Sequence, residues 1–230
     1  YKKKYLLNKV LNNNAYLSYI FLKDRSLSLA SRQDVNNFKD FILKHARAGK
    51  ILDIGCGPLD LPGYLDFPDK KNYEFYGLDP IESNSFKGFR VTGCAEFMPF
   101  EDSYFDTIIF ATSLDHVCSL EKTILETYRV LSENGKVIIW LGDKSTTIRQ
   151  RFTKKIKNMI KSIKEGYRVD KYFIYPNLTV FYIPDGAQDS YHTIISDPKK
   201  TIKMMKKANF ELEELDYRNK NEVFISFKKK

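Results

Sequence analysis

The stretch ILDIGCGPLDLPGYL, residues 51–65, decides the fold of this chain. A hydrophobic run stops at an acid, Asp53, and two glycines follow with one residue between them, Gly55 and Gly57. Glycine allows a turn with positive φ, and because it lacks a Cβ it lets a ligand lie directly against the main chain. The stretch therefore predicts a buried strand that ends in a ligand-binding turn.

Further apolar runs alternate with helical patterns along the chain. The runs predicted as strands are YEFYGLD (73–79), FRVTGC (89–94), FDTIIFA (105–111), KVIIWLG (136–142, after the turn SENG), ELEELDY (211–217) and NEVFISF (221–227). Apolar spacing predicts helices over 32–46, 119–131 and 197–210. This alternation predicts an α/β fold with a mainly parallel, doubly wound sheet between two helical layers. The short connection at 218–221 predicts that the last two strands form an antiparallel hairpin.

The 230 residues are predicted to form a single domain with two additions, N-terminal helices over 1–48 and an inserted substrate cap over 148–192. The net charge is +9, and residues 148–171 hold nine Lys or Arg against two acids. Such a segment is either a solvated helix face or attracts an anionic partner. A phosphorylated or nucleotide-linked small molecule, RNA and an acidic membrane surface all stay open as that partner.

The cysteines and the hydropathy pattern indicate the compartment. Three cysteines without metal-ligand spacing predict a reducing environment and no disulfide framework. We find no secretory signal and no apolar run of about 18 residues. We therefore expect a cytoplasmic protein, while its oligomeric state stays open.

The residues around the glycine turn indicate the kind of ligand. Asp79 lies 22 residues after Gly57, at the end of the next predicted strand. A carboxylate about 20 residues beyond a glycine turn can accept the hydroxyl groups of a ribose. Position 60 is Asp60, so the dinucleotide pattern is not met. Asp53 would repel a pyrophosphate but suits a cation, and S-adenosylmethionine carries a sulfonium and an ammonium group without phosphate.

Four segments, in order and at matching spacing, carry a resemblance to a known family. LDIGCG, GLD, GCAEFMPFEDSYFDTIIF and ETYRVLSENGKV resemble successive motifs of the class I, Rossmann-like S-adenosylmethionine-dependent methyltransferases, in particular the small-molecule methyltransferase domain family. The resemblance covers roughly residues 40–142 and resumes at 198–228. It implies a seven-stranded sheet with a reversed final hairpin, and methyltransferase activity with S-adenosylmethionine as cofactor.

The resemblance also assigns residues along the cofactor. They are Asp53, Gly55, Cys56 and Gly57 at the methionine end, Asp79 at the ribose, Ala95 and Glu96 beside the adenine with Met98 and Phe100 nearby, and Ala111 and Thr112 under the sulfonium. The chain departs from the family at Cys94, where many relatives have Asp, and at Leu59, which replaces a frequent third glycine. Pro62 and Gly63 leave room for only a short first crossover helix.

The segment SLDHV, 113–117, resembles the L-E-H-V segment of several small-molecule O-methyltransferases. The resemblance implies that Asp115 and His116 face the acceptor, with His116 as general base. Two alternatives stay open: the pair helps to bind Mg²⁺, or Asp115 caps the following helix with His116 packed beside it. Two ligands are too few to argue a metal site, so we predict no metal.

A second candidate base, His192, lies in DSYHTIISDP, 189–198, where the predicted cap returns to the sheet. In related sugar and lipid methyltransferases this return segment reaches the acceptor, which makes Tyr191 a candidate substrate contact. The alternative is a histidine in a surface loop.

The leading functional hypothesis is methyl transfer to the oxygen of a small, anionic acceptor, such as a nucleotide-activated sugar or a related surface-polysaccharide precursor. The first alternative is an RNA methyltransferase, although the end of the fourth predicted strand reads ATSLDH and not N-P-P-Y. The second is a non-catalytic cofactor-binding partner subunit, against which the ribose acid Asp79 is present. Docking on a membrane surface is compatible with all three.

Overall fold

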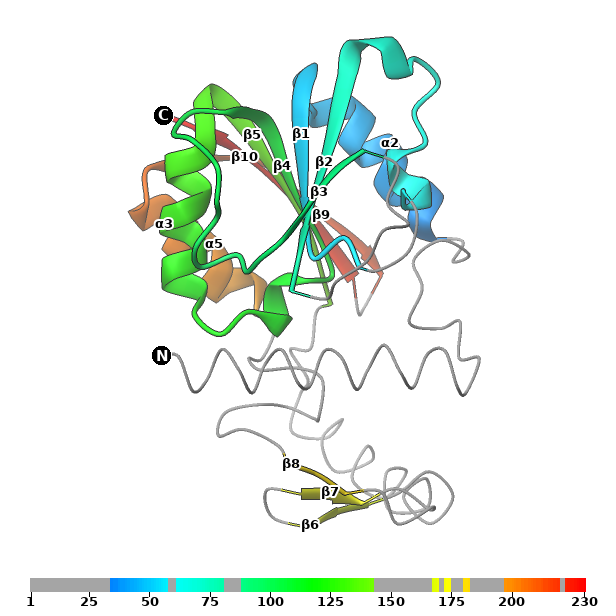
Figure 1. Ribbon diagram of the computed structural model, residues 1–230, viewed down its shortest axis with the longest axis vertical. Coiled ribbons are helices and arrows are strands. Elements are labelled where there is room, and N and C mark those ends of the chain that lie inside the picture. The colour runs from blue at the N-terminus through cyan, green and yellow to red at the C-terminus, as the bar shows by residue number, and fades with distance from the viewer. Residues whose placement is uncertain are drawn as a thin grey trace.

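The computed structural model describes residues 34–57, 61–80, 88–142, 167–169, 172–174, 180–182, 197–219 and 222–230. Seven of its strands are β1 (Gly49–Ile54), β2 (Tyr73–Asp79), β3 (Phe89–Thr92), β4 (Phe105–Ala111), β5 (Leu131–Gly142), β9 (Phe210–Asn219) and β10 (Glu222–Lys229). They form one sheet in the order β3-β2-β1-β4-β5-β10-β9 (Figure 1). The first five are parallel, and β10 is antiparallel to both of its neighbours. The predicted sheet and its C-terminal hairpin are confirmed.

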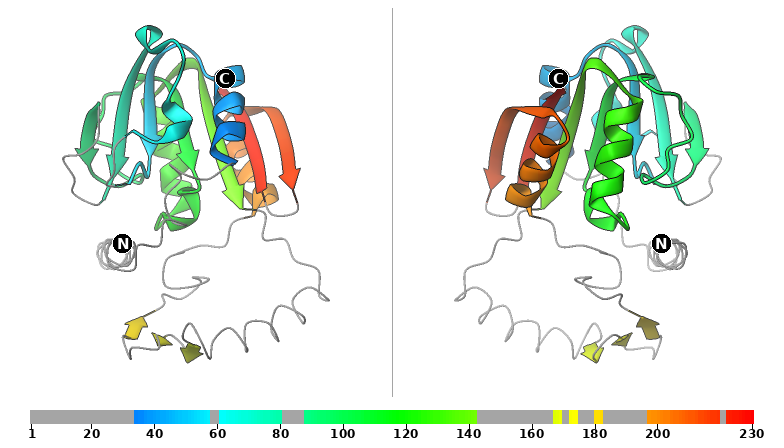
Figure 2. Two further views of the ribbon diagram at one scale, coloured as in Figure 1. Left: turned by 90° about the vertical axis from the view of Figure 1, so that its right-hand side faces the viewer. Right: turned by 90° about the vertical axis from the view of Figure 1, so that its left-hand side faces the viewer.

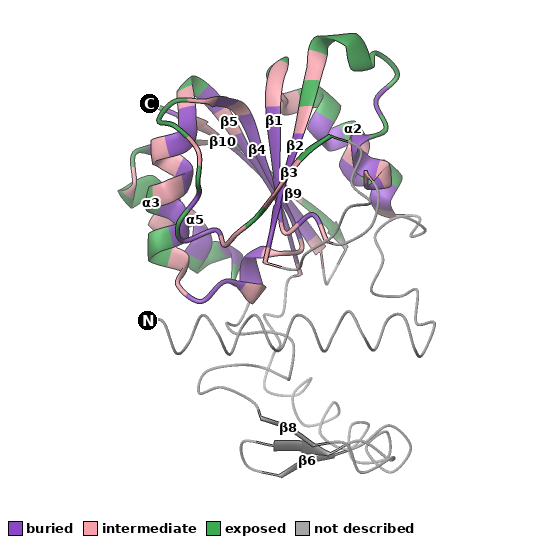
Figure 3. Ribbon diagram, in the orientation of Figure 1, coloured by how far each residue is buried: buried purple, intermediate pink, exposed green. Residues whose placement is uncertain are grey.

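Helices cover both faces of this sheet, which confirms the three layers. Helix α2 (Asp34–His45) lies on one face, and α3 (Leu120–Val130) and α5 (Pro198–Lys207) lie on the other (Figure 2). Ser119 and Asp197 cap α3 and α5 with their side-chain oxygens, as residues of these types do at helix N-termini. Figure 3 shows the buried residues concentrated along the central strands and on the inner sides of the helices.

On one face of the sheet, α2 packs against strands that include β10, near the end of the described chain. Phe38 of α2 is fully buried, and its ring centroid lies 5.1 Å from that of Trp140 and 5.0 Å from that of Phe224 in β10. Nε2 of His45, at the end of α2, lies 2.8 Å from Oε2 of Glu214 in β9. Trp140 is therefore part of the buried core, whereas His45 lies partly buried at its edge.

The start of β5 differs from the prediction. We predicted a turn at 132–135 before a strand that begins at Lys136, but β5 begins at Leu131. Leu131 and Lys136 pair with β4 residues only two positions apart, so the four residues between them bulge out of the ladder. Asn134 in this bulge has φ of 59°. The turn chemistry was recognised correctly, but the strand boundary was wrong.

Among the described residues, the main domain also contains three 3-10 helices: η3 (Gly63–Leu65), η4 (Lys70–Asn72) and η5 (Leu114–His116). The two that lie between β1 and β2, η3 and η4, have three residues each. The short first crossover that Pro62 and Gly63 predicted is thus confirmed.

A small antiparallel sheet of β6 (Tyr167–Val169), β7 (Tyr172–Ile174) and β8 (Val180–Tyr182) falls within the predicted cap, where we had predicted no strands. The basic helical pattern of the cap and residues 1–33 of the predicted N-terminal helices lie outside the described residues. Among the helices that the structure describes, none is long and apolar enough to cross a membrane.

The order of the strands in the sheet changes direction at β1. The chain passes from β1 to β2 and β3 on one side, and returns to β4 and β5 on the other. In an open α/β sheet, ligands bind at the carboxyl ends of the strands where this switch occurs. The site should therefore lie where β1, β2 and β4 end.

Candidate functional site

The surroundings of the two glycines after β1 differ. Both lie in the left-handed region, with φ of +79° at Gly55 and +72° at Gly57. A Cβ at Gly55 would lie 2.4 Å from the Cβ of Ser113, so the protein itself closes this position. A Cβ at Gly57 would meet no atom within 4 Å among the described residues. Gly57 therefore borders open space, where a ligand can reach the main chain.

The end of β4 is held against the end of β1. Oγ of Ser113 donates a hydrogen bond of 2.5 Å to the carbonyl of Ile54. Thr112 has φ of 56°, which is uncommon for a β-branched residue, and its N–H donates to the carbonyl of Trp140 at 3.0 Å. Backbone strain of this kind clusters at binding sites. β4 thus ends at Ala111, followed by Thr112, directly beside the glycine turn, and their predicted place under the sulfonium stays a prediction.

Asp79 also lies at this turn. It is the last residue of β2, it is buried, and its Oδ2 accepts a hydrogen bond of 2.9 Å from the N–H of Gly57. The structure therefore brings together the predicted ribose acid and the predicted ligand-facing glycine, which are 22 residues apart in the chain.

Arg90 is part of the site and was missed by the sequence analysis. Its side chain is buried, and Nη2 lies 3.4 Å from the carbonyl oxygen of Gly57 and 4.0 Å from Oδ1 of Asp79. The residue comes from β3, which lies beside β2. The available signal was an arginine in the otherwise mostly apolar run FRV, next to the strand that ends in an acid.

Asp53 of β1, four residues before Gly57, is a fully buried carboxylate. Tyr64 of η3, which the sequence analysis did not identify, donates a hydrogen bond of 2.7 Å to Oδ2 of Asp53. Oδ1 is buried and has no hydrogen-bond partner in the part of the chain that the structure describes. Burial raises the pKa of Asp53 to about 7, and the charge of Asp79 adds to this, while the Tyr64 hydrogen bond opposes it. A buried oxygen of this kind suits a cationic group.

Cys56, between the glycines, is buried, and its Sγ lies 3.6 Å from the carbonyl oxygen of Gly57. Burial, with the nearby carboxylates of Asp53 and Asp79, raises the pKa of this thiol well above its ordinary value. The thiol is therefore protonated and inert. The contribution left to Cys56 is through its backbone.

Ala95 and Glu96 lie buried in the loop after β3. Oε1 of Glu96 accepts hydrogen bonds from the N–H groups of Cys118 at 2.5 Å and Ser119 at 2.9 Å, at the start of α3. Its carboxylate thus serves the protein's own backbone. The predicted place of Ala95 and Glu96 beside the adenine stays a prediction.

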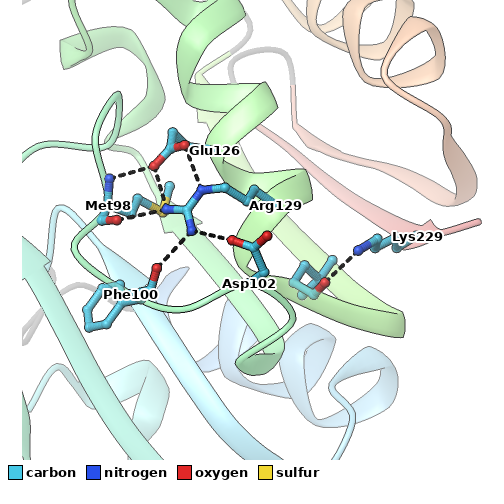
Figure 4. Close-up of polar contacts among 7 residues, drawn as sticks. Met98, Phe100, Asp102, Glu126, Arg129 and Lys229 are labelled. Carbon is cyan, nitrogen blue, oxygen red and sulfur yellow. Dashed lines mark hydrogen bonds and ion pairs between the residues drawn. The ribbon is translucent and has the colours of Figure 1, made fainter.

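The same loop is tied to α3 by Arg129 (Figure 4). The guanidinium of Arg129 donates hydrogen bonds of 2.8 Å to the carbonyls of Met98 and Phe100, and it also contacts the carboxylates of Asp102 and Glu126. Glu126 in turn accepts from the N–H of Met98 at 2.8 Å. The loop that is predicted to pack near the adenine is therefore fixed at several points.

Asp115 and His116 lie in η5, directly after the end of β4. Oδ1 of Asp115 is 3.7 Å from Nε2 of His116, and their side chains are 8% and 29% exposed. The alternative in which Asp115 caps α3 is wrong, because the cap is Ser119, whose Oγ accepts from the N–H of Lys122 at 3.4 Å. A partly exposed imidazole beside a buried carboxylate can take up a proton.

Metal ligands and the second candidate base complete the comparison with the sequence. No group of three or more His, Cys, Asp or Glu side chains that could hold a metal ion occurs within the described ranges. His192 and Tyr191 lie outside the described residues, so their predicted contact with the acceptor stays a prediction.

Sequence comparisons place these residues in a family. Residues 52–139, from β1 through the glycine turn, β2, β3 and β4 into β5, match the family described as Methyltransferase domain. An uncharacterized protein of Methanocaldococcus jannaschii is 28% identical over 182 residues, 76% of this chain and 66% of the relative. The ubiquinone/menaquinone biosynthesis C-methyltransferase UbiE of Vibrio campbellii is 26% identical over 186 residues, 72% of this chain. The aligned part spans just under two thirds of each relative, 66%.

Solved structures share the fold. The PH0226 protein of Pyrococcus horikoshii superposes with a TM-score of 0.62 at 19% identity, covering 92% of this chain and 98% of that one. A 1,6-didemethyltoxoflavin-N1-methyltransferase of Burkholderia thailandensis, solved with S-adenosylhomocysteine, gives a TM-score of 0.59 at 11% identity, covering 96% and 87%. The family match covers the glycine turn and the strand ends where the acids converge. The comparisons therefore identify residues 52–139 of this chain as a methyltransferase domain, with the class I, Rossmann-like fold of the S-adenosylmethionine-dependent methyltransferases.

Proposed function

We propose that this enzyme methylates a small, anionic acceptor that carries an ionisable hydroxyl group. The observation that supports this most is the convergence of Gly57, Asp53 and Asp79 where β1 and β2 end, with His116 following β4. S-adenosylmethionine, when bound, supplies a methyl group activated by a positively charged sulfur. The rest of the chemistry is left to side chains of this chain.

The residues fit this cofactor in three respects. A carboxylate has about four acceptor positions, so Asp79 can accept from ribose hydroxyls in addition to the N–H of Gly57. The unpartnered, buried Oδ1 of Asp53 favours a cationic methionine end. Gly57 borders open space, so the backbone can be approached closely.

His116 is the proposed general base. A neutral imidazole can take the proton of an acceptor hydroxyl, and the carboxylate of Asp115, 3.7 Å away, would stabilise the imidazolium that forms. Removal of this proton makes the acceptor oxygen a better nucleophile. A positioned base of this kind contributes about 100- to 10,000-fold to the rate.

Two acceptor classes follow from different observations. The net charge of +9 supports an anionic acceptor, and our first candidate is O-methylation of a nucleotide-activated sugar or a related surface-polysaccharide precursor. The second is C-methylation of a quinol-type ring, which the name of the UbiE relative supports. Both begin with removal of a hydroxyl proton. A deprotonated sugar hydroxyl is nucleophilic at its oxygen, whereas a deprotonated phenol carries negative charge on its oxygen and on the ortho carbon.

The test separates binding from turnover. Calorimetry with S-adenosylhomocysteine should show binding by the wild type, and His116→Gln should keep that affinity within about twofold. The variant should lose about 100- to 10,000-fold in turnover with a nucleotide-sugar or quinol acceptor. His45→Gln is the matched control, since His45 pairs with Glu214 at the far edge strand and its turnover should be unchanged.

Mass spectrometry of the product would identify the methylated atom. Absence of S-adenosylhomocysteine binding by the wild type would remove the cofactor site. Normal turnover by His116→Gln would remove His116 as the base while leaving the cofactor site standing.

A further inference from the structure

Charged side chains from two strands contact the backbone of Gly57. Its N–H donates to Oδ2 of Asp79 at 2.9 Å, and its carbonyl faces Nη2 of Arg90 at 3.4 Å. The same Nη2 lies 4.0 Å from Oδ1 of Asp79. Both polar groups of the ligand-facing glycine are thus held, one by an acid on β2 and the other by a base on β3.

Both charged partners are removed from water. The side chains of Arg90 and Asp79 are 6% and 8% exposed. Removing one charge of such a pair leaves the other buried without compensation, which is strongly unfavourable. The 4.0 Å separation between Nη2 and Oδ1 is longer than a direct hydrogen bond, so this pair interacts through charge.

The register of the sheet explains how Arg90 reaches this place. In the parallel pairing of β2 with β3, Arg90 lies opposite Gly77, and Asp79 lies opposite Thr92. Side chains two residues apart on a strand share one face, so positions 77 and 79 face the same way. Because Gly77 has no side chain, the long side chain of Arg90 can pass along β2 toward Asp79.

We infer that Arg90 is a positioning residue for the cofactor's ribose. It holds the carboxylate of Asp79 and the carbonyl of Gly57 in place before the ligand binds, so that the ribose hydroxyls meet acceptors that are already oriented. Such preorganisation improves affinity because less ordering is left to binding. The inference rests on the proposed placement of the ribose on Asp79.

The experiment measures whether Arg90 acts through the ribose. Arg90→Met, Arg90→Lys and the wild type are titrated with S-adenosylhomocysteine and with its 2′,3′-dideoxy analogue. Arg90→Met should bind S-adenosylhomocysteine about tenfold more weakly and the dideoxy analogue within about twofold of wild type. Arg90→Lys keeps the charge without the planar fork, so its affinity for S-adenosylhomocysteine should lie between those of the wild type and Arg90→Met. This variant replaces Arg90→Met in the test if Arg90→Met does not fold.

Asp79→Asn provides the coupling test. In the Asp79→Asn background, Arg90→Met should change S-adenosylhomocysteine affinity by less than about twofold, because the acid on which Arg90 acts is gone. Arg47→Met is the control for loss of an arginine elsewhere, since Arg47 bonds the carbonyl of Glu133 at 2.8 Å, near the amino end of β1. That variant should bind both ligands normally.

The outcomes separate this inference from the cofactor site itself. If Asp79→Asn binds S-adenosylhomocysteine as tightly as wild type, the placement of the ribose on Asp79 fails, and this inference fails with it. If Asp79→Asn weakens binding but Arg90→Met does not, the positioning role of Arg90 fails while the placement of the ribose on Asp79 stands. Equal losses for the two ligands in Arg90→Met would also overturn the inference, because a merely structural role does not distinguish them.

Discussion

The side chain of Ser113 fills the place that a side chain at position 55 would need, with the two Cβ positions only 2.4 Å apart. The turn after β4 is therefore packed into the turn after β1, and the Ser113 hydrogen bond to Ile54 fixes this contact. This internal packing requires a glycine at position 55, whereas a Cβ at position 57 would meet no described atom within 4 Å. The two glycines of one motif should therefore respond differently to the same substitution.

Gly55→Ala should lower the free energy of unfolding by about 2–4 kcal/mol, from overpacking together with the positive φ. Urea denaturation of the ligand-free protein measures this. Ser113→Gly in the Gly55→Ala background removes the opposing Cβ and should recover part of the loss. No recovery in the double variant would show that the Ser113 contact is not the cause.

Gly57→Ala should lower the free energy of unfolding by only about 1–2 kcal/mol, because the added methyl meets no described atom and only its φ of +72° is unfavourable. Its affinity for S-adenosylhomocysteine should fall by about tenfold or more, since the methyl enters the ligand's space. Calorimetry and urea denaturation on the same sample separate the two effects. A large loss of stability with normal affinity would reverse the roles assigned to the two glycines.

Asp53 should make stability depend on pH. Its pKa in the folded state is raised from 3.8 to about 7, so the folded state binds this proton more tightly than the unfolded state. Its contribution to stability is then fully present below about pH 4 and is lost as the pH rises to about 7. The difference in unfolding free energy between wild type and Asp53→Asn should fall by a few kcal/mol across this range.

The Tyr64 hydrogen bond gives a companion variant. The hydrogen bond from Tyr64 lowers the pKa of Asp53. Tyr64→Phe removes this bond and should therefore extend the fall in stability to higher pH. Denaturation curves at several pH values measure both effects. A flat difference between wild type and Asp53→Asn would contradict the raised pKa.

Arg129→Met should lower the free energy of unfolding by about 2–4 kcal/mol, because it strands the carbonyls of Met98 and Phe100 and the carboxylate of Glu126. Arg218→Met is the matched control. Arg218 forms a partly exposed ion pair of 2.8 Å with Asp216, and such pairs contribute about 1 kcal/mol or less. Equal losses in the two variants would show that the Arg129 network in Figure 4 adds nothing beyond one surface pair.

The central strands β1, β4, β5 and β10 could be predicted because their runs are largely apolar and buried. Asp79 and Gly57 could be paired from their spacing and the rule for strand ends. Arg90 and Tyr64 could not, because their contacts depend on the register of β3 against β2 and on the path of η3. The start of β5 failed for a similar reason, since a turn within a strand and a turn before it have the same local composition.

The pairing of Phe38 with Phe224 also bears on how the chain is assembled during translation. The apolar side of α2 is synthesised early, but part of its cover comes from β10, about 190 residues later. Until that strand leaves the ribosome, the surface around Phe38 stays partly open, and exposed apolar surface of this kind promotes aggregation. Nascent chains that stop before β10 should therefore depend on chaperones far more than chains that include it.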